Sequence, residues 1–489
     1  MCMHAWWRSV TIAAALSILA GIGQARAQTV VQPDTFVSSP QDEIQLLQQR
    51  LDQYEKTLQS LQQELTIQVS QPVGRDYSFT ELDRRVEALE ASWMNEKPAG
   101  ADGGWTKVDI QKKPNVKING RVFMDHIMYD DADPALGVNR QTETGFDTAR
   151  IGVSGNVYEN VKYKLEVEFE GEEVDYKDIY MEFKNLPLLG NFRIGHYKEP
   201  FSLEELTSSR FITWMERSMP YQSFVPQRNF GFMIHDDVRG NDNLSWWLGA
   251  FRGDFDDGPK KVGSLRNDPS DWCVTGRVAW LPYYDEVSKG RYLVHVGGAA
   301  SYRKTAKYGE NIEFGNKPEI GTQSAYLGAV EILNDRDWSL VGVEAAVVWG
   351  AASVQTEFYG VNTGDHELNG GYVEASYFLT GEHRGYKKSS KAFNRVKPLE
   401  DAFRVSTEEG ICTGLGAWQL KARWSYLDLN DADAANDTRG YQDNLSLGVN
   451  WYLNPYTRFM FDYIYEDIKR ADAVTGDANN FGLRFQFDY

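Results

Sequence analysis

The chain contains 489 residues, of which 42% are hydrophobic and 13% aromatic, and it carries a formal charge of −19. This composition excludes a disordered chain. The longest apolar run, residues 11–22, is shorter than the ~20 residues that a membrane-spanning helix needs, so a helical channel or transporter is also excluded. The acidic balance would repel the phosphates of a nucleic acid, and we expect no nucleic-acid partner.

The N-terminus has the organisation of a secretory signal peptide. Arg8 precedes the apolar run, and residues 25–27 (Ala-Arg-Ala) form a small-residue cleavage site. We therefore predict a signal peptide over 1–27 and an exported protein that begins at Gln28, the alternative being an uncleaved anchor. Loss of two arginines with this leader would take the formal charge from −19 to −21.

Residues 28–113 are predicted to form a helical region followed by a linker. Apolar residues recur at steps of three and four over 44–65 and again over 79–93, amid Gln, Glu and Lys. This seam predicts an N-terminal periplasmic coiled coil, and the alternative is a single amphipathic helix packed on its own domain. The breaker-rich stretch 97–104 separates this region from the rest of the chain.

From residue 114 to the C-terminus the hydrophobic pattern has a period of two. Between 161 and 170, apolar residues at odd positions alternate with Lys and Glu at even positions. Such strands fit a soluble sandwich or an outer-membrane barrel with a water-filled lumen. Export, the aromatic last residue Tyr489, an abundance of Tyr, Phe and Trp for interfacial girdles, and alternation of tight turns with long loops together favour the barrel.

The lengths of the connections allow the strands to be counted. A barrel with both ends in the periplasm needs an even number of strands, whereas a simple count gives seventeen. We place residues 322–333 in a long fifth outer loop, about 304–337. The prediction is then a transmembrane barrel of sixteen antiparallel strands over 114–489. The same parity places the long connection 382–413 in the periplasm, where turns are normally short.

Several sequence blocks of this barrel match a known family. They are RIGHYKEPFSLEELTSSRFITWMERSMP at 193–220, GGYVEASYFLTGEHRGY at 370–386, GAWQLKARWSYLDLN at 416–430 and NWYLNPYTRFMFDY at 450–463. With these blocks the chain resembles the phosphate- and polyphosphate-selective porins O and P. The resemblance implies a trimeric sixteen-stranded barrel, a third loop folded inward, a ladder of lumenal arginines and a long periplasmic turn that reaches into the lumen.

Basic side chains in such a lumen would replace part of the hydration shell of a passing anion. Where the family tends to have consecutive arginines, residues 147–150 supply only Arg150. The alternative for each candidate is an ion pair with a nearby acid such as Glu166 or Glu168. The anion-path candidates on strands are Arg150, Lys162, Lys164, Arg277, Lys421, Arg423 and Arg484, and those in the third loop are Arg210, Arg217 and Arg228.

The periplasmic connection contains a run of six basic residues without an acid, over 384–397. Like charges at this density repel one another unless counterions lie between them. We expect an anion trap at the inner mouth and predict that glutamate at 387, 388 and 391 abolishes or reverses any anion preference; the alternative is a solvated basic loop. The six residues are Arg384, Lys387, Lys388, Lys391, Arg395 and Lys397.

The sequence thus predicts an outer-membrane porin for small anions such as phosphate or polyphosphate. Its expected partners are outer-membrane lipid, small anions, two further copies in a homotrimer and, through the coiled coil, the cell wall. Alternatives are a weakly selective porin, a cell-envelope linker, or an enzyme barrel, for which no nucleophile and His motif is evident. We expect no cofactor and no metal, because only Cys273 and Cys412 follow the leader and they are not spaced as ligands; whether they pair is left open.

Overall fold

The computed structural model describes residues 115–489 except for 131–132, 172–173, 239–240, 253–271, 305–311, 315–316, 324, 328–329, 333–336, 408–409 and 433–438. These residues belong to the second of two compact units, 1–87 and 88–489. The predicted signal peptide and coiled coil lie outside the described residues. Among the described residues, no helix has both the length and the apolar composition to cross a membrane.

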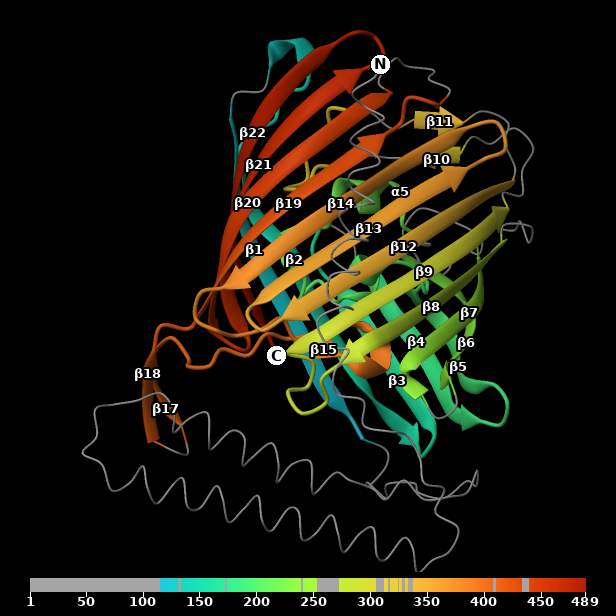
Figure 1. Ribbon diagram of the computed structural model, residues 1–489, viewed down its shortest axis with the longest axis vertical. Helices are drawn as coiled ribbons and strands as arrows, with labels where there is room; N and C mark the ends of the chain where they lie inside the picture. Colours follow the sequence, from blue (N-terminus) through green and yellow to red (C-terminus); the bar gives the residue numbers. More distant parts are fainter. Residues whose placement is uncertain are drawn as a thin grey trace, which may run out of the picture. The chain divides into compact units, whose positions relative to one another are not determined.

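Sixteen antiparallel strands form a closed barrel (Figure 1), which confirms the predicted number. Each strand pairs with the next in the list below, and β22 closes the barrel by pairing with β1. The strands are β1 (Lys117–Asp130), β2 (Glu143–Tyr158), β3 (Val161–Glu168), β4 (Asp175–Leu186), β5 (Gly190–Lys198), β6 (Arg228–Val238), β7 (Asn241–Arg252), β8 (Trp272–Tyr284), β9 (Tyr292–Lys304), β12 (Asp337–Trp349), β13 (Ala352–Asn362), β14 (Glu367–Phe378), β19 (Ala417–Asp428), β20 (Gly440–Asn454), β21 (Thr457–Arg470) and β22 (Thr475–Asp488).

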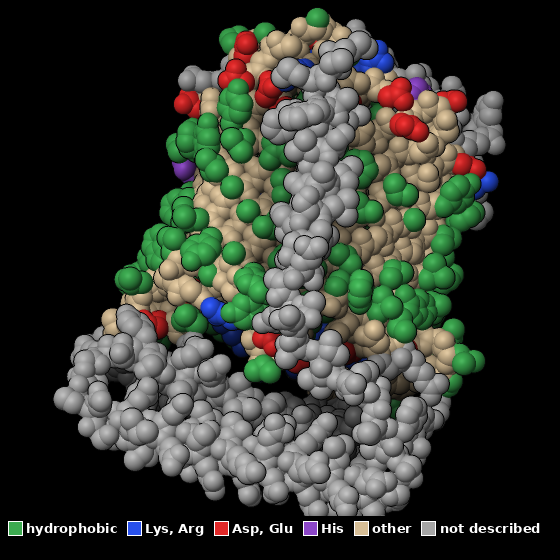
Figure 2. All heavy atoms as spheres, viewed as in Figure 1, with side chains coloured by type: hydrophobic (Ala, Val, Ile, Leu, Met, Phe, Trp, Pro, Cys, Tyr) green, Lys and Arg blue, Asp and Glu red, His purple; other side chains and the backbone are tan. Residues whose placement is uncertain are grey.

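The period-two pattern puts apolar side chains on the outer face of the wall. On β3, for example, Leu165 is exposed whereas Glu166 and Glu168 are buried on the lumenal side. Outer aromatic rings form rows near both ends of β19, around Trp418 and around Tyr426. Figure 2 shows hydrophobic side chains spread over the wall and charged ones gathered towards its ends. This distribution is that of a surface in contact with lipid.

The connections have the predicted asymmetry. Short turns join β2 to β3, β8 to β9 and β20 to β21 at the end of the barrel where the chain enters β1 and leaves β22. The predicted fifth outer loop is confirmed, because β10 (Ile312–Phe314) and β11 (Val330–Ile332) pair only with each other at the opposite end. The connection from β14 to β19 lies at the end of the short turns, as parity requires.

That connection contains two short strand pairs and one 3₁₀ turn. The first pair is β15 (Tyr386–Lys387) and β16 (Ala392–Phe393), with the turn η2 (Lys388–Ser390) between its strands, and the second is the hairpin of β17 (Phe403–Thr407) and β18 (Gly410–Gly414). The first outer loop holds a second 3₁₀ turn, η1 (Pro134–Leu136).

Loops fill much of the interior. The third loop carries α4 (Leu203–Leu206) and α5 (Met219–Phe224), and its Phe201 and Phe224 pack against Tyr359 of β13 and Phe314 of the fifth loop. Ile320 of the fifth loop packs with Met215 of the third in a second apolar cluster against β1 and β21. The inward fold of the third loop is thus observed, and its apolar contacts cover the inner faces of β12–β14 and β19–β22.

Candidate anion path

Four of the seven strand candidates are buried beneath the loops. Each forms an ion pair: Arg277 with Glu344 (Nε to Oε1 2.9 Å), Lys421 with Asp462, Arg423 with Glu319 (2.9 Å) and Arg484 with Asp125 (2.7 Å). They point inward, as predicted, but they do not reach water. We therefore assign them to the anchoring of loops and restrict the proposed path to the remaining candidates.

The acidic partners on this side of the barrel also hold the third loop. Glu357 of β13 accepts hydrogen bonds from the backbone N–H groups of Leu203 and Glu204, at 2.9 and 2.7 Å. Arg484 donates to the carbonyl of Met215, whose own N–H donates to Asp462 at 3.0 Å. The loop is therefore fixed by buried charged groups, which rules this half of the lumen out as a wide aqueous passage.

The opposite half of the lumen is lined by a cationic wall, which we define as Arg150, Lys162, Lys164, Arg193 and Arg228 on β2 to β6. Lys164 is 21% exposed and pairs with Glu166, which is 1% exposed, at 3.0 Å. Arg193 is 22% exposed and pairs with Glu182, which is 4% exposed.

Arg150 shows the same arrangement, since it is more exposed than Glu168, its partner at 2.7 Å. Arg228 pairs with Asp178 at 2.8 Å, and these two side chains are about equally covered. In most of these pairs the carboxylate is therefore buried behind the cation, and the wall presents positive charge to water.

The third loop approaches this wall through residues 208–210. Arg121 of β1 donates to Ser209 Oγ at 2.7 Å and to Glu166 at 3.2 Å, and it is the register partner of Arg150. Burial lowers the pKa of Arg210, and the charge of nearby Arg395 adds to this effect, which Asp488 opposes. Guanidinium groups thus crowd the place where the third loop meets the wall, which we call the constriction.

Sequence reasoning missed Arg121 and Arg193. The lumenal positions of β1 alternate Arg121, Phe123, Asp125 and Ile127, so two large apolar side chains face inward and obscure the polar face. Ile127 packs on the inward loops, and Phe123 lies against the guanidinium of Arg484. On β5, glycines at 190 and 195 shorten the alternating pattern around Arg193. A strict count of strand parity could have found both arginines.

The basic run of the inner turn lies among lumen-facing side chains. Tyr386 Oη is 2.8 Å from His295 Nδ1 of β9, and Phe393 packs with Leu203 of the third loop. Arg384 pairs with Glu374 at 2.8 Å, Lys388 with Asp242 at 2.8 Å and with Glu286, and Arg395 with Asp488. Lys391 donates to the carbonyls of Asp242 and Lys388, at 2.7 and 2.8 Å.

At this inner mouth, Lys387 of the turn, Lys162 of β3 and Lys184 of β4 have no ion pair in the described part of the chain. Burial lowers the pKa of Lys387, and the charges of Lys162 and Lys184 lower it further, so the three ammonium groups share one region. Lys397 also has no ion pair among the described residues, and it is exposed, but unlike Lys387 it is not part of this group.

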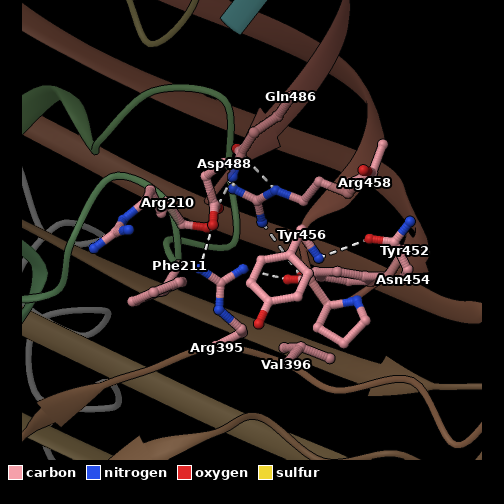
Figure 3. A pocket seen from close by; sticks show the side chains of 12 residues that line it. Arg210, Phe211, Arg395, Val396, Tyr452, Asn454, Tyr456, Arg458, Gln486 and Asp488 are labelled. Atoms are coloured by element: carbon pink, nitrogen blue, oxygen red, sulfur yellow. Dashed lines mark hydrogen bonds and ion pairs between the residues drawn. The ribbon is translucent and has the colours of Figure 1, made fainter. Parts of the chain in front are cut away.

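A small recess of about 10 Å³, room for about one water molecule, lies beside the inner mouth and is lined by Arg210, Arg395 and Arg458 (Figure 3). Among the described residues that line it, Asp488 is the only one with a side-chain carboxylate, and Arg395 points to it. Arg458 instead donates to Gln486 Oε1, at 3.0 Å from Nε and 2.8 Å from Nη2. The recess therefore has an excess of positive charge. Arg458 contributes to it, although this residue of β21 was not predicted as a candidate from the sequence.

One cluster of three carboxylates has the spacing of a metal site. The oxygens of Asp125, Asp147 and Glu216 lie within 4.8 Å of one another. The guanidinium of Arg484 binds all three, at 2.7, 2.9 and 2.8 Å. This cation takes the place that a metal ion would need. Cys273 is free and buried, and the Cys412 side chain lies outside the described ones.

Comparison with known proteins places this geometry in a family. The chain is 24% identical to Porin O of Pseudomonas aeruginosa over 417 residues, covering 79% of this chain and 91% of that protein. It is 27% identical over 493 residues to an uncharacterised protein of Caulobacter vibrioides, covering 95% and 92%. The solved anion-selective porin of Comamonas acidovorans is 13% identical, covers 77% of this chain and 99% of its own, and has a TM-score of 0.46. Residues 116–489 match the family model described as phosphate-selective porin O and P, and the chain belongs to that family of outer-membrane porins.

Proposed function

We propose that this outer-membrane porin passes small anions by diffusion along the cationic wall and out through the inner mouth. The observation that carries the proposal is the orientation of the wall's ion pairs. Lys164, Arg193 and Arg150 are partly exposed, and each is more exposed than the carboxylate that it pairs with. An anion on this path therefore meets positive charge first.

The acidic net charge of the chain does not oppose this proposal. A field in a narrow, low-dielectric passage is set by the charges nearest to the ion, and more distant charges are screened beyond about 10 Å at 0.1 M salt. The buried acids also keep each cation in place without removing its remaining N–H donors. Arginine and lysine held in this way can exchange hydrogen bonds with a passing anion without binding it so tightly that it stalls.

Phosphate-type oxyanions are the proposed preferred substrates. Guanidinium groups form paired hydrogen bonds to tetrahedral oxyanions, and Arg121, Arg150 and Arg210 meet at the constriction. In the inner turn, Lys387 is the proposed core of the anion trap, because Lys388 and Arg395 are engaged by Asp242, Glu286 and Asp488. The proposal includes no catalytic step.

We further propose that the porin is a homotrimer, which membership of the family supports, with the predicted coiled coil on its periplasmic side. Chemical cross-linking of the purified protein should give a species of three chains. A monomeric product at all cross-linker concentrations would contradict the trimer without affecting the anion path.

The reversal potential of the purified protein in a planar bilayer with a KCl gradient tests the main proposal. We expect the sign for chloride preference, and we expect added phosphate to reduce the chloride current. A potential near zero would indicate a general porin, and the sign for potassium would refute anion selectivity. Absence of conductance would favour an envelope linker.

A further inference from the structure

The connection between β14 and β19 passes over the rim of the barrel. Its first half, 384–397, contacts lumen-facing groups such as Glu374 and His295. Its second half turns to the outside, where the N–H of Ala402 donates to the carbonyl of Leu453 at 2.6 Å, next to the end of β20. The hairpin of β17 and β18 then projects beyond the strand ends (Figure 1).

The base of this hairpin meets an outer row of aromatic side chains. On adjacent strands β19 to β22, the rings of Trp418, Trp451, Phe459 and Phe485 follow one another with centroids 5.1, 6.0 and 5.0 Å apart. Phe403, at the start of β17, adds a further ring 5.7 Å from Trp451. The row belongs to the lipid-facing surface of the barrel, at the end that carries the short turns.

Backbone geometry holds the hairpin base against this row. The indole N–H groups of Trp418 and Trp451 both donate to the carbonyl of Leu415, at 3.1 and 2.8 Å. Gly416 has a φ of +68°, and a Cβ there would lie 2.2 Å from the carbonyl oxygen of Tyr452, so only glycine allows this approach. Phe403 adopts a φ of +66°, a strained conformation for a bulky residue.

Two apolar side chains at this base are largely exposed in the part of the chain that the structure describes. Phe403 is 63% exposed and Leu415 is 75% exposed. Exposure of the phenyl ring to water would provide no free energy to offset the strain of the Phe403 backbone. The same ring placed among lipid headgroups would be stabilised there and would extend the aromatic row.

We propose that Phe403 and Leu415 form a membrane-interface lip, seated at the boundary between headgroups and acyl chains of the inner leaflet. The occupant is phospholipid, because the lip continues a surface that already faces lipid. The connection then contacts both faces of the barrel wall, with its basic run on the lumenal face and its hairpin base at the membrane interface. This inference rests on the outer-membrane location and is independent of the proposed anion selectivity.

Site-specific fluorescence quenching tests the lip. Phe403→Cys and Leu415→Cys, each combined with Cys412→Ser, are labelled with the fluorophore NBD and reconstituted into dioleoylphosphatidylcholine vesicles. Quenching is measured with phosphatidylcholine that carries a nitroxide near the headgroup end of one acyl chain, and separately with iodide on both sides of the membrane. Each variant is accepted only if its unboiled gel mobility shows a folded barrel.

Two positions calibrate the result. Leu420→Cys lies on the outer face of β19, and Lys289→Cys lies on the exposed turn between β8 and β9. We expect nitroxide lipid to quench labels at 403 and 415 at least about twofold more than at 289, and iodide to quench them less, as at 420. Iodide quenching equal to that at 289, without nitroxide quenching at either 403 or 415, would overturn the proposal.

Discussion

Removal of Lys162 and Lys387, two of the described lysines at the inner mouth that form no ion pair, should weaken the preference of the pore for anions. Lys162 and Lys387 have no carboxylate within ion-pair distance in the described part of the chain; Glu182 attracts both from farther away, and other basic groups repel both. Glutamine at these positions therefore deletes a charge without leaving a buried acid unpaired. The barrel should fold as before.

The size of the effect follows from Coulomb's law. An anion about 6 Å from one ammonium gains about 1.4 kcal/mol at an effective dielectric constant of about 40, between bulk water and a protein surface. Screening at 0.1 M salt reduces this energy to about 0.8 kcal/mol. Each substitution should then lower the permeability of chloride about fourfold and raise that of potassium about as much, because the lysine attracts one ion and repels the other. The chloride-to-potassium permeability ratio should therefore fall about 15-fold, and Lys162→Gln with Lys387→Gln should lower it further.

The assay is the reversal potential of single-channel or multichannel current between 100 and 10 mM KCl. These concentrations are chosen so that salt screens the lysine charges no more than at the 0.1 M used in the calculation. Lys397→Gln is the matched control, because it removes the same charge from the same turn at an exposed position. We expect this control to change the ratio less than about twofold. A double variant that keeps the selectivity of the unmodified pore would refute the assignment of Lys162 and Lys387 to the path.

Three further outcomes are expected. Burial raises the pKa of Glu204 in the third loop to about 8, although Arg423 opposes the shift, whereas an unfolded glutamate ionises near pH 4.5. The melting temperature should therefore fall between pH 5 and pH 9, and it should fall less in Glu204→Gln. Equal slopes of melting temperature against pH for the two proteins in differential scanning calorimetry would contradict this. Arg484→Met leaves three carboxylates without their shared cation and should destabilise the barrel by about 3–5 kcal/mol. On gels of samples heated to increasing temperatures, the folded band should disappear at a lower temperature than in the unmodified protein. An unchanged transition temperature would show that the ion pairs of Arg484 are dispensable. Leu51→Asp with Leu58→Asp should dissociate the predicted coiled coil while leaving the barrel oligomer intact; an isolated 40–96 peptide that is monomeric and unfolded at high concentration would disprove the coiled coil.

The barrel could be predicted from the sequence because each strand records its own environment. A side chain on a membrane strand meets either lipid or the lumen, and the choice alternates with every residue, as between Leu165 and Glu166. Strand parity then placed 322–333 outside the barrel and the connection before β19 at the inner end, and both predictions are confirmed. The same alternation pointed the candidate arginines and lysines of β2, β3, β8, β19 and β22 inward.

Which of those cations reach water was decided only by tertiary structure. Glu319 of the fifth loop meets Arg423, 104 positions away, and Glu216 of the third loop meets Arg484, 268 positions away. Such pairs depend on how two long loops fold into the lumen, and no local periodicity records that. Lys164 and Arg423 both lie at lumenal positions of their strands, yet Lys164 lines the cationic wall and Arg423 is buried. The reason is that apolar residues of the third loop pack against β13, β14 and β19, whereas its polar residues 208–210 meet the wall.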